Sequence, residues 1–212
     1  MKEETIKTGT TTIGLVCAEG VVLAADRRAT SGNMIIDKNF TKIHSITDNI
    51  ALTIAGTVSD VQLLVKLIRA ELKLKDIRTD REATVSEASN LLAGMVYANI
   101  RKFSVIPGIS HFIVGGKDQS GFHLFDVYPD GSLKESTEYI SSGSGSVMAY
   151  GVLETMYKKN MPINDAVKLA VTSLNAAIQR DSASGSGFDV ITITKDGVKK
   201  VAEKDLTVKV EL

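Results

Sequence analysis

Short runs of apolar and β-branched residues recur along the chain and predict strands. These runs cover residues 11–17, 20–25, 42–46, 50–56, 111–115, 122–128, 188–194 and 198–201. Turn-forming pairs separate several of them, as at Asp48-Asn49 and Asp130-Gly131. The short stretch 18–20 joins the first two runs and predicts a hairpin. The chain is therefore expected to open with paired strands.

Four other stretches have helical spacing, with apolar residues three or four positions apart. In the first two, the residues predicted to face the core are Val61, Leu64, Val65, Ile68 and Leu72, and then Ala88, Leu91, Leu92, Met95 and Val96. Ser59 with Gln62, and Thr84 with Glu87, have the spacing of capping boxes at the starts of these helices. A third helix is predicted after Gly145.

The fourth helix is predicted after Pro162, with Asn164 as its cap, and runs to Arg180. The order of elements is then strands, two helices, strands, two helices and final strands. Clustered strands with paired helices argue against alternating βαβ units and a parallel sheet. Two sheets covered by helix pairs satisfy this order in an α+β fold. No internal repeat or linker divides the chain, so a single domain is expected.

Charge and cysteine content exclude several classes of function. The 25 basic and 25 acidic residues leave no basic excess that would suggest nucleic acid or a membrane surface. Cys17 is the only cysteine and lies in an apolar run, which predicts a buried thiol and excludes an internal disulfide. His44, His111 and His123 lack metal-ligand spacing, so a metal site is not expected.

Nothing in the sequence indicates secretion or membrane insertion. Residues 1–9 are charged and lack the apolar run of a secretory signal. No stretch approaches the roughly 20 apolar residues of a membrane span. A soluble, cytoplasmic protein is therefore expected.

Residues 8–12 read Thr-Gly-Thr-Thr-Thr and allow two interpretations. Threonine favours strands, so the segment can be purely structural. If the chain is cut after Gly9, however, Thr10 carries both a hydroxyl and a free α-amine. The ordinary pKa of an α-amine, about 7.7–8.0, suits a base near neutral pH. An N-terminal amine is also a known activator of a threonine hydroxyl.

Three more positions have both a structural and a catalytic interpretation. Asp26 ends an apolar run and precedes two arginines. It either joins a surface ion pair, worth about 0–1 kcal/mol, or holds a nearby cation in place, for which Lys42 is the candidate. Gly56 lies between a strand run and a predicted helix. It either permits the turn there or offers a backbone N–H to an oxyanion.

Two polar loops complete the candidate chemistry. Residues 141–146 (SSGSGS) lie between a strand and a helix, as a phosphate-binding loop would. However, no lysine follows in the Walker position, and Met148 stands where a dinucleotide motif needs glycine, so a flexible turn is the other interpretation. Asp181 lies at the end of the fourth helix, where the helix dipole disfavours an anion. A carboxylate in a locally poor position is a pointer to function.

Taken together, these segments resemble the proteasome β-subunit family, within the N-terminal-nucleophile hydrolases, and look most like archaeal subunits. The resemblance covers nearly the whole chain from Thr8 onward. The segments that carry it, in family order, are TGTTTIG, ADRRAT, TIAG, SSGSGS with AYGVLE, and QRDSASG. The resemblance implies a four-layer αββα sandwich of two antiparallel sheets between helix layers. It also implies a propeptide of residues 1–9 and a hydrolase domain of residues 10–212.

The resemblance implies a role for each candidate residue. Thr10 corresponds to the nucleophile, and cleavage between Gly9 and Thr10 exposes it. Asp26 and Lys42 correspond to the acid and cation beside the nucleophile, and Gly56 to the oxyanion donor. The residues that position the Thr10 amine are Ser144, Asp181 and Ser184. The residues that line the substrate pocket are Ala29, Ile54 and Val58, with His44 nearby.

The implied activity is that of a threonine endopeptidase that degrades unfolded proteins without a metal or organic cofactor. The apolar pocket residues predict cleavage after apolar side chains. The implied partners are other β subunits in a seven-membered ring, α-subunit rings, and a regulatory ATPase that acts through the α ring. Three alternatives stay open: a non-catalytic ring subunit, a small-molecule amidase of the same superfamily, and a nucleotide-binding module.

Overall fold

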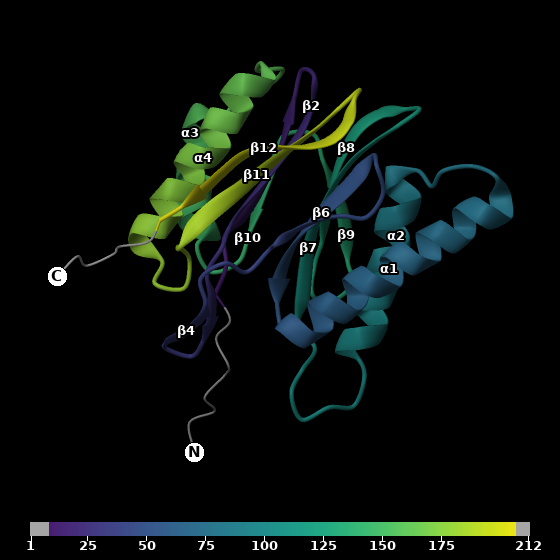
Figure 1. The fold of residues 1–212 in the computed structure, drawn as a ribbon, viewed down its shortest axis with the longest axis horizontal. Coiled ribbons are helices and arrows are strands. Elements are labelled where there is room, and N and C mark those ends of the chain that lie inside the picture. The colour runs from purple at the N-terminus through teal and green to yellow at the C-terminus, as the bar shows by residue number, and fades with distance from the viewer. Residues whose placement is uncertain (1–8, 207–212) are drawn as a thin grey trace.

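The computed structural model describes residues 9–206 and contains two stacked β-sheets between two helix pairs. Figure 1 shows α3 and α4 on one outer face and α1 and α2 on the other, with the sheets between them. All strand pairings in the two sheets are antiparallel. The predicted α+β fold with an αββα sandwich is therefore confirmed.

The first sheet has the strand order β10-β1-β2-β11-β12. Its strands are β1 (Thr12–Cys17), β2 (Gly20–Asp26), β10 (Tyr139–Ser142), β11 (Gly187–Thr194) and β12 (Gly197–Asp205). The helices that cover it are α3 (Ser146–Met156) and α4 (Ile163–Arg180). The buried side of α4 is rich in alanine, which lets its backbone approach β1 and β2 closely.

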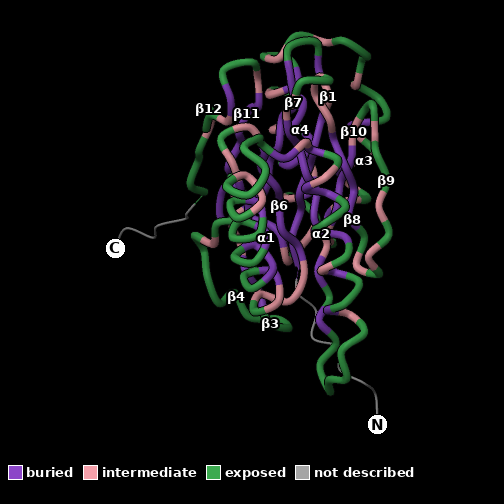
Figure 2. Tube along the Cα trace, turned by 90° about the vertical axis from the view of Figure 1, so that its right-hand side faces the viewer, coloured by how far each residue is buried: buried purple, intermediate pink, exposed green. Residues whose placement is uncertain are grey.

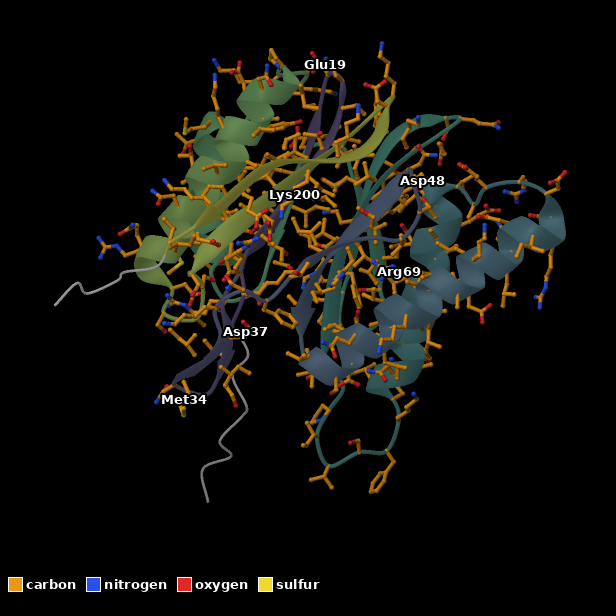
Figure 3. All side chains as sticks on the ribbon, in the orientation of Figure 1. Glu19, Met34, Asp37, Asp48, Arg69 and Lys200 are labelled. Atoms are coloured by element: carbon orange, nitrogen blue, oxygen red, sulfur yellow. The ribbon has the colours of Figure 1, made fainter. Side chains whose placement is uncertain are left out.

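The second sheet has the strand order β5-β6-β7-β8-β9. Its strands are β5 (Ile43–Ser45), β6 (Ile50–Gly56), β7 (Ser110–Asp118), β8 (Gly121–Val127) and β9 (Leu133–Ser136). The helices that cover it are α1 (Val58–Thr79) and α2 (Val85–Ile100). A small hairpin of β3 (Ala29–Ser31) and β4 (Met34–Asp37) projects from the sandwich, with Met34 near its tip (Figure 3).

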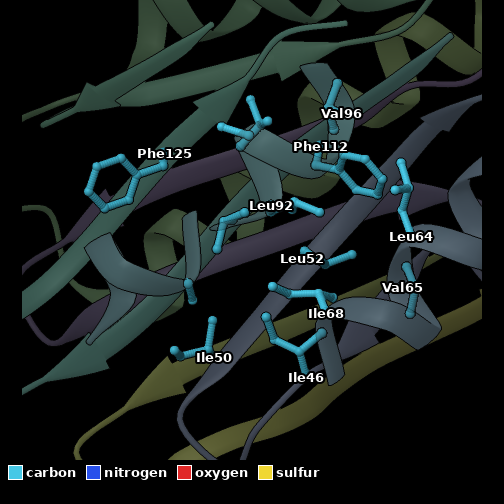
Figure 4. Close-up of a cluster of buried hydrophobic side chains, with 14 of the residues drawn as sticks. Ile46, Ile50, Leu52, Leu64, Val65, Ile68, Leu92, Val96, Phe112 and Phe125 are labelled. Atoms are coloured by element: carbon cyan, nitrogen blue, oxygen red, sulfur yellow. The ribbon is translucent and has the colours of Figure 1, made fainter. Parts of the chain in front are cut away.

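Three apolar layers hold the sandwich together. One lies between the sheets, one under α3 and α4, and one under α1 and α2. Figure 4 shows the last of these, where Leu52 and Phe112 from the sheet meet Ile68 and Leu92 from the helices. Figure 2 shows the strands largely buried and the helices exposed on their outer faces. Truncating one of these core leucines to alanine should cost about 2–5 kcal/mol.

The helix predictions are confirmed in part. The stripe from Val61 to Leu72 is buried on α1, and Thr84 and Glu87 form a complete capping box on α2. The predicted box of Ser59 with Gln62 is wrong, because α1 begins earlier, at Val58, and Thr57 is its N-cap.

Two smaller helix predictions are also wrong. Asn164 lies inside α4 and not at its cap, because the helix starts at Ile163 directly after Pro162. Leu91, expected to face the core, is 37% exposed on the outer side of α2. Its neighbour Leu92 takes the buried position in the same turn.

The strand predictions are confirmed for the hairpins β1–β2 and β5–β6 and for β7, β8, β11 and β12. Cys17 is buried, as expected. The sequence pattern missed β3, β4, β9 and β10, which are only three or four residues long. Among the helices of the described residues, none is long and apolar enough to cross a membrane. The secretory-signal prediction concerns residues that lie, apart from Gly9, outside the described part.

Candidate active site

A small pocket, partly open to solvent, lies where the residues before β1 meet the end of β6. The predicted site residues that line it are Thr10, Lys42, Gly56, Ala29, Ile54 and Val58. Gly9 lines it as well, so both sides of the predicted cleavage site face the pocket. Residues just before β1, from β3 and β6, and from the start of α1 thus meet at one place.

Thr10 lies just before β1 and is buried, with 7% of its surface exposed. Its Oγ1 donates a hydrogen bond to the carbonyl oxygen of Gly9, 2.7 Å away. Its backbone N–H points the other way and donates to Ser144 Oγ at 3.2 Å. The Thr10 hydroxyl therefore lies beside the carbonyl group of the peptide bond that precedes it.

Gly143 explains how the loop 141–146 comes so close to Thr10. A Cβ atom at Gly143 would lie 2.0 Å from the Thr10 carbonyl oxygen, and its φ of +91° is one that side chains rarely adopt. The glycine therefore lets the loop pack its backbone against Thr10. This packing presents Ser144 to the Thr10 nitrogen.

Asp26 and Lys42 form a buried ion pair, with 2.7 Å between Oδ1 and Nζ. The same oxygen accepts the N–H of Thr11, and the other carboxylate oxygen accepts the N–H groups of Arg28 and Gly185. Burial lowers the pKa of Lys42, and the charge of Asp26 opposes this shift. Removing one member of such a buried pair typically costs about 3–5 kcal/mol.

Gly56 ends β6 with a φ of +124°, which favours glycine. A Cβ atom there would lie 2.1 Å from the carbonyl oxygen of Ile109. The next residue, Thr57, donates its N–H to that same oxygen and is the N-cap of α1. The partial positive charge of the helix N-terminus consequently lies next to the pocket, where it favours an anion.

Asp181 is the C-cap of α4, and its carboxylate is the centre of a small hydrogen-bond network. Its Oδ2 accepts the hydroxyls of Ser144 and Ser184, each at 2.6 Å. Its Oδ1 accepts the N–H of Ala183 at 3.2 Å. The helix dipole disfavours a negative charge at this end of α4. The hydrogen bonds from donors outside the helix stabilise the Asp181 carboxylate and so explain why an acid is tolerated there.

The structure joins the predicted site residues into two groups on either side of Thr10. Lys42 and Asp26 lie on the pocket side, whereas Asp181 and Ser184 reach Thr10 only through Ser144. His44 is not among the described residues that line the pocket. Its pKa is lowered, first by burial and then by the charge of Arg69.

Several residues at the site were missed by the sequence interpretation. Thr30 Oγ1 accepts the N–H of Gly9 at 3.2 Å, and Phe40 and Val61 complete the apolar wall of the pocket. Ala183 lies so close to Gly9 that a Cβ atom at position 9 would be 1.7 Å from the Ala183 Cβ. Thr30 and Ala183 both lie inside the sequence segments that carry the resemblance, but neither residue type signals a role by itself.

The chain is similar to known proteins over most of its length. Residues 6–193 match the family model for proteasome subunits. A proteasome subunit beta of Ferroglobus placidus is 44% identical over 187 residues, which cover 88% of this chain and 87% of the relative.

Two more archaeal relatives, both described as proteasome subunit beta, extend the match. The protein of Methanocorpusculum labreanum is 44% identical over 202 residues, which are 95% of this chain and 93% of the relative. The protein of Methanocaldococcus jannaschii is 40% identical over 199 residues, which are 93% of this chain and 87% of the relative. The chain therefore belongs to the proteasome subunit family.

Proposed function

We propose that the mature chain is an N-terminal threonine endopeptidase with Thr10 as its nucleophile. As a proteasome β subunit, the chain is part of a protease. The observation that supports the finer assignment is the common pocket of Thr10, Lys42 and Gly56. In this proposal residues 1–9 are a propeptide and residues 10–212 form the mature hydrolase.

The chain exposes its own nucleophile. Thr10 Oγ attacks the carbonyl carbon of Gly9, beside whose oxygen it already lies. The new carbon–oxygen bond forms as the peptide C–N bond breaks, and the hydroxyl proton moves to the nitrogen, which leaves an ester. Water hydrolyses the ester, which releases the propeptide as a carboxylic acid and frees the hydroxyl and α-amine of Thr10.

Peptide hydrolysis repeats this chemistry on a substrate carbonyl. The α-amine of Thr10 takes the hydroxyl proton, directly or through water. The Lys42 ammonium stabilises charge that develops near Oγ, and Asp26 holds Lys42 in place. The Gly56 N–H stabilises the tetrahedral oxyanion. Ser144, Asp181 and Ser184 position the amine, and no metal or organic cofactor takes part.

The pocket selects apolar side chains. Ala29, Ile54 and Val58 line it together with Phe40 and Val61, and all of these are uncharged and apolar. Full burial of a large apolar side chain is worth about 1.5–3 kcal/mol. A charged side chain would lose its hydration there, and Lys42, the charged residue of the lining, is already paired with Asp26. Cleavage after large apolar residues is therefore preferred.

As a proteasome subunit, the chain assembles with other subunits into rings. We further propose a seven-membered β ring, stacked against rings of α subunits, with a regulatory ATPase that delivers unfolded proteins through the α ring. The cytoplasm is the proposed location.

The test is hydrolysis of fluorogenic peptides by particles assembled with an α subunit. The native particles should hydrolyse the peptides, Thr10→Ala particles should not, and Thr12→Val serves as a control for a buried threonine outside the pocket. Native particles that assemble and stay inactive would point to a non-catalytic ring subunit. Activity in a species of monomer mass would instead point to a small-molecule amidase.

A further inference from the structure

Thr11, which follows the nucleophile, lies between the two groups of the site and is completely buried. Its N–H donates to Asp26 Oδ1 at 2.9 Å, on the oxygen that also binds Lys42. Its Oγ1 lies 2.7 Å from Ser184 Oγ, on the other side of the chain. This residue is therefore in direct contact with both groups that flank Thr10.

The direction of each hydrogen bond in this network follows from the number of available hydrogens. A carboxylate only accepts, so Ser144 and Ser184 each donate their single hydroxyl hydrogen to Asp181 Oδ2. Ser184 then has no hydrogen left for Thr11, and the hydroxyl of Thr11 must donate to Ser184 Oγ. In the same way, the N–H of Thr10 donates to Ser144 Oγ.

Two donor chains thus converge on one oxygen of Asp181. The first runs from the Thr10 nitrogen through Ser144, and the second from the Thr11 hydroxyl through Ser184. The second chain fixes the hydroxyl of Ser184, and through it the place of the carboxylate that holds Ser144. The Thr10 nitrogen at the end of the first chain therefore depends on the hydroxyl of Thr11.

The loop around Ser144 leaves space for the hydroxyl of Thr11. A Cβ atom at Gly145 would lie 2.0 Å from Thr11 Oγ1 and 3.2 Å from Asp181 Oδ2. The φ of Gly145 is −86°, which any residue can adopt, so backbone strain does not explain the glycine. The space that Gly145 leaves is occupied by the Thr11 hydroxyl beside the carboxylate.

We infer that Thr11 is a positioning residue for the reaction, because its side-chain hydroxyl holds the Ser184–Asp181–Ser144 group that orients the Thr10 amine. This inference rests on the proposed function of Thr10. Thr11 does not line the substrate pocket, so it acts on the chemical step and not on substrate binding.

Thr12 offers a matched control. It is also completely buried, and its Oγ1 lies 2.7 Å from the hydroxyl of Ser142, in a pair separate from Asp181. Thr11→Val and Thr12→Val therefore remove the same hydroxyl–hydroxyl bond from neighbouring buried positions. Any general cost of placing valine at a buried threonine is common to both variants.

The experiment measures kcat and KM for an apolar fluorogenic peptide on assembled particles, divided by the fraction of chains whose intact mass shows that the propeptide is gone. Thr11→Val should lower kcat about tenfold or more and leave KM within about twofold. Thr12→Val should leave both constants within about twofold. Thr11→Ser, which restores the hydroxyl, should recover at least about a third of native kcat.

Each outcome bears on a different claim. A Thr11→Val chain that keeps its propeptide while Thr12→Val loses it supports the inference, because Ser144 also holds the Thr10 nitrogen, which is the leaving group in processing. Equal kcat in Thr11→Val and Thr12→Val, or no recovery in Thr11→Ser, overturns it while the Thr10 mechanism stands. Activity that survives Thr10→Ala overturns the proposed function, and this inference with it.

Discussion

Lys42 Nζ lies 2.7 Å from Asp26 Oδ1, and the two side chains are 2% and 0% exposed. The Asp26 carboxylate also accepts three backbone N–H groups, from Thr11, Arg28 and Gly185. The carboxylate of the ion pair is therefore held by the residue before β1, by the residues after β2 and by the loop after α4. Such a carboxylate can hold an ammonium group beside Thr10 with little freedom to move.

Lys42→Ala should abolish most peptidase activity and spare the fold. The ammonium stabilises charge that is present mainly in the transition state, so kcat/KM should fall about 100- to 1,000-fold or more. The chain should still fold, because the Asp26 carboxylate keeps its three backbone donors, although the lost ion pair costs about 3–5 kcal/mol of stability. Lys42→Arg should fail too, since a planar guanidinium does not replace a compact ammonium in a buried space.

The measurement is peptide hydrolysis by processed particles, with Lys38→Ala as the control. Lys38 is exposed in the same segment of the chain. Near-native turnover in processed Lys42→Ala particles would contradict the role given to Lys42.

Asp26→Asn should destabilise the chain as well as inactivate it. An amide has one acceptor oxygen, whereas both oxygens of Asp26 accept two hydrogen bonds each. Buried donors would be left without an acceptor, and the free energy of unfolding should fall by about 2–5 kcal/mol. Urea unfolding of the full chain measures this change, and a loss below about 1 kcal/mol would show that the carboxylate is not needed.

Gly9→Ala should block removal of the propeptide, because the new Cβ would lie 1.7 Å from the Ala183 Cβ. The side chain would move the Gly9 carbonyl away from the Thr10 hydroxyl. Gly9→Ala combined with Ala183→Gly should recover part of the processing, since the closest atom is then the Ala183 Cα at 2.9 Å. The fraction of processed chains is read from intact mass, and Ala183→Gly alone is the control. Normal processing of Gly9→Ala would rule out this steric explanation.

The long, periodic elements were predictable because their signals are local. Thr84 and Glu87 are three residues apart, so the sequence alone shows a capping box that the structure contains. The same rule failed at Ser59, where the turn at Gly56 starts α1 two residues earlier, with Thr57 as its N-cap. The short strand β10 has little pattern of its own, and its pairing with β1 joins residues such as Thr12 and Ser142.

The candidate site likewise contains residues that the sequence indicated and contacts that only the structure showed. The family resemblance indicated Thr10, Lys42 and Asp181. In the structure Thr10 and Lys42 line one pocket, and Asp181 is linked to the Thr10 nitrogen through Ser144. The contacts of Thr11 with Ser184 and of Gly9 with Ala183 join residues more than 170 positions apart. No spacing rule reaches across such a distance, so these partners emerged only from the folded chain.

The pocket should prefer apolar side chains, and the preference should respond to charge. Peptides that end in Leu or Tyr before the reporter group should be cleaved about tenfold faster than those that end in Arg or Glu. Val58→Glu adds a carboxylate to the pocket wall and should raise relative cleavage after Arg. Leu63→Glu adds the same charge to an exposed position on α1 and should not. Faster cleavage after Arg or Glu than after Leu or Tyr in native particles would refute the pocket assignment and leave the Thr10 mechanism standing.

The central claim is that Thr10 cleaves the bond before it and then acts as the nucleophile. The most direct test is the intact mass of the chain after assembly with an α subunit, in the native form and as Thr10→Ala and Thr10→Ser. The native chain and Thr10→Ser should lose residues 1–9, because both keep a hydroxyl beside the Gly9 carbonyl, whereas Thr10→Ala should keep them. Efficient removal of residues 1–9 from Thr10→Ala, with no other active subunit present, would contradict the account.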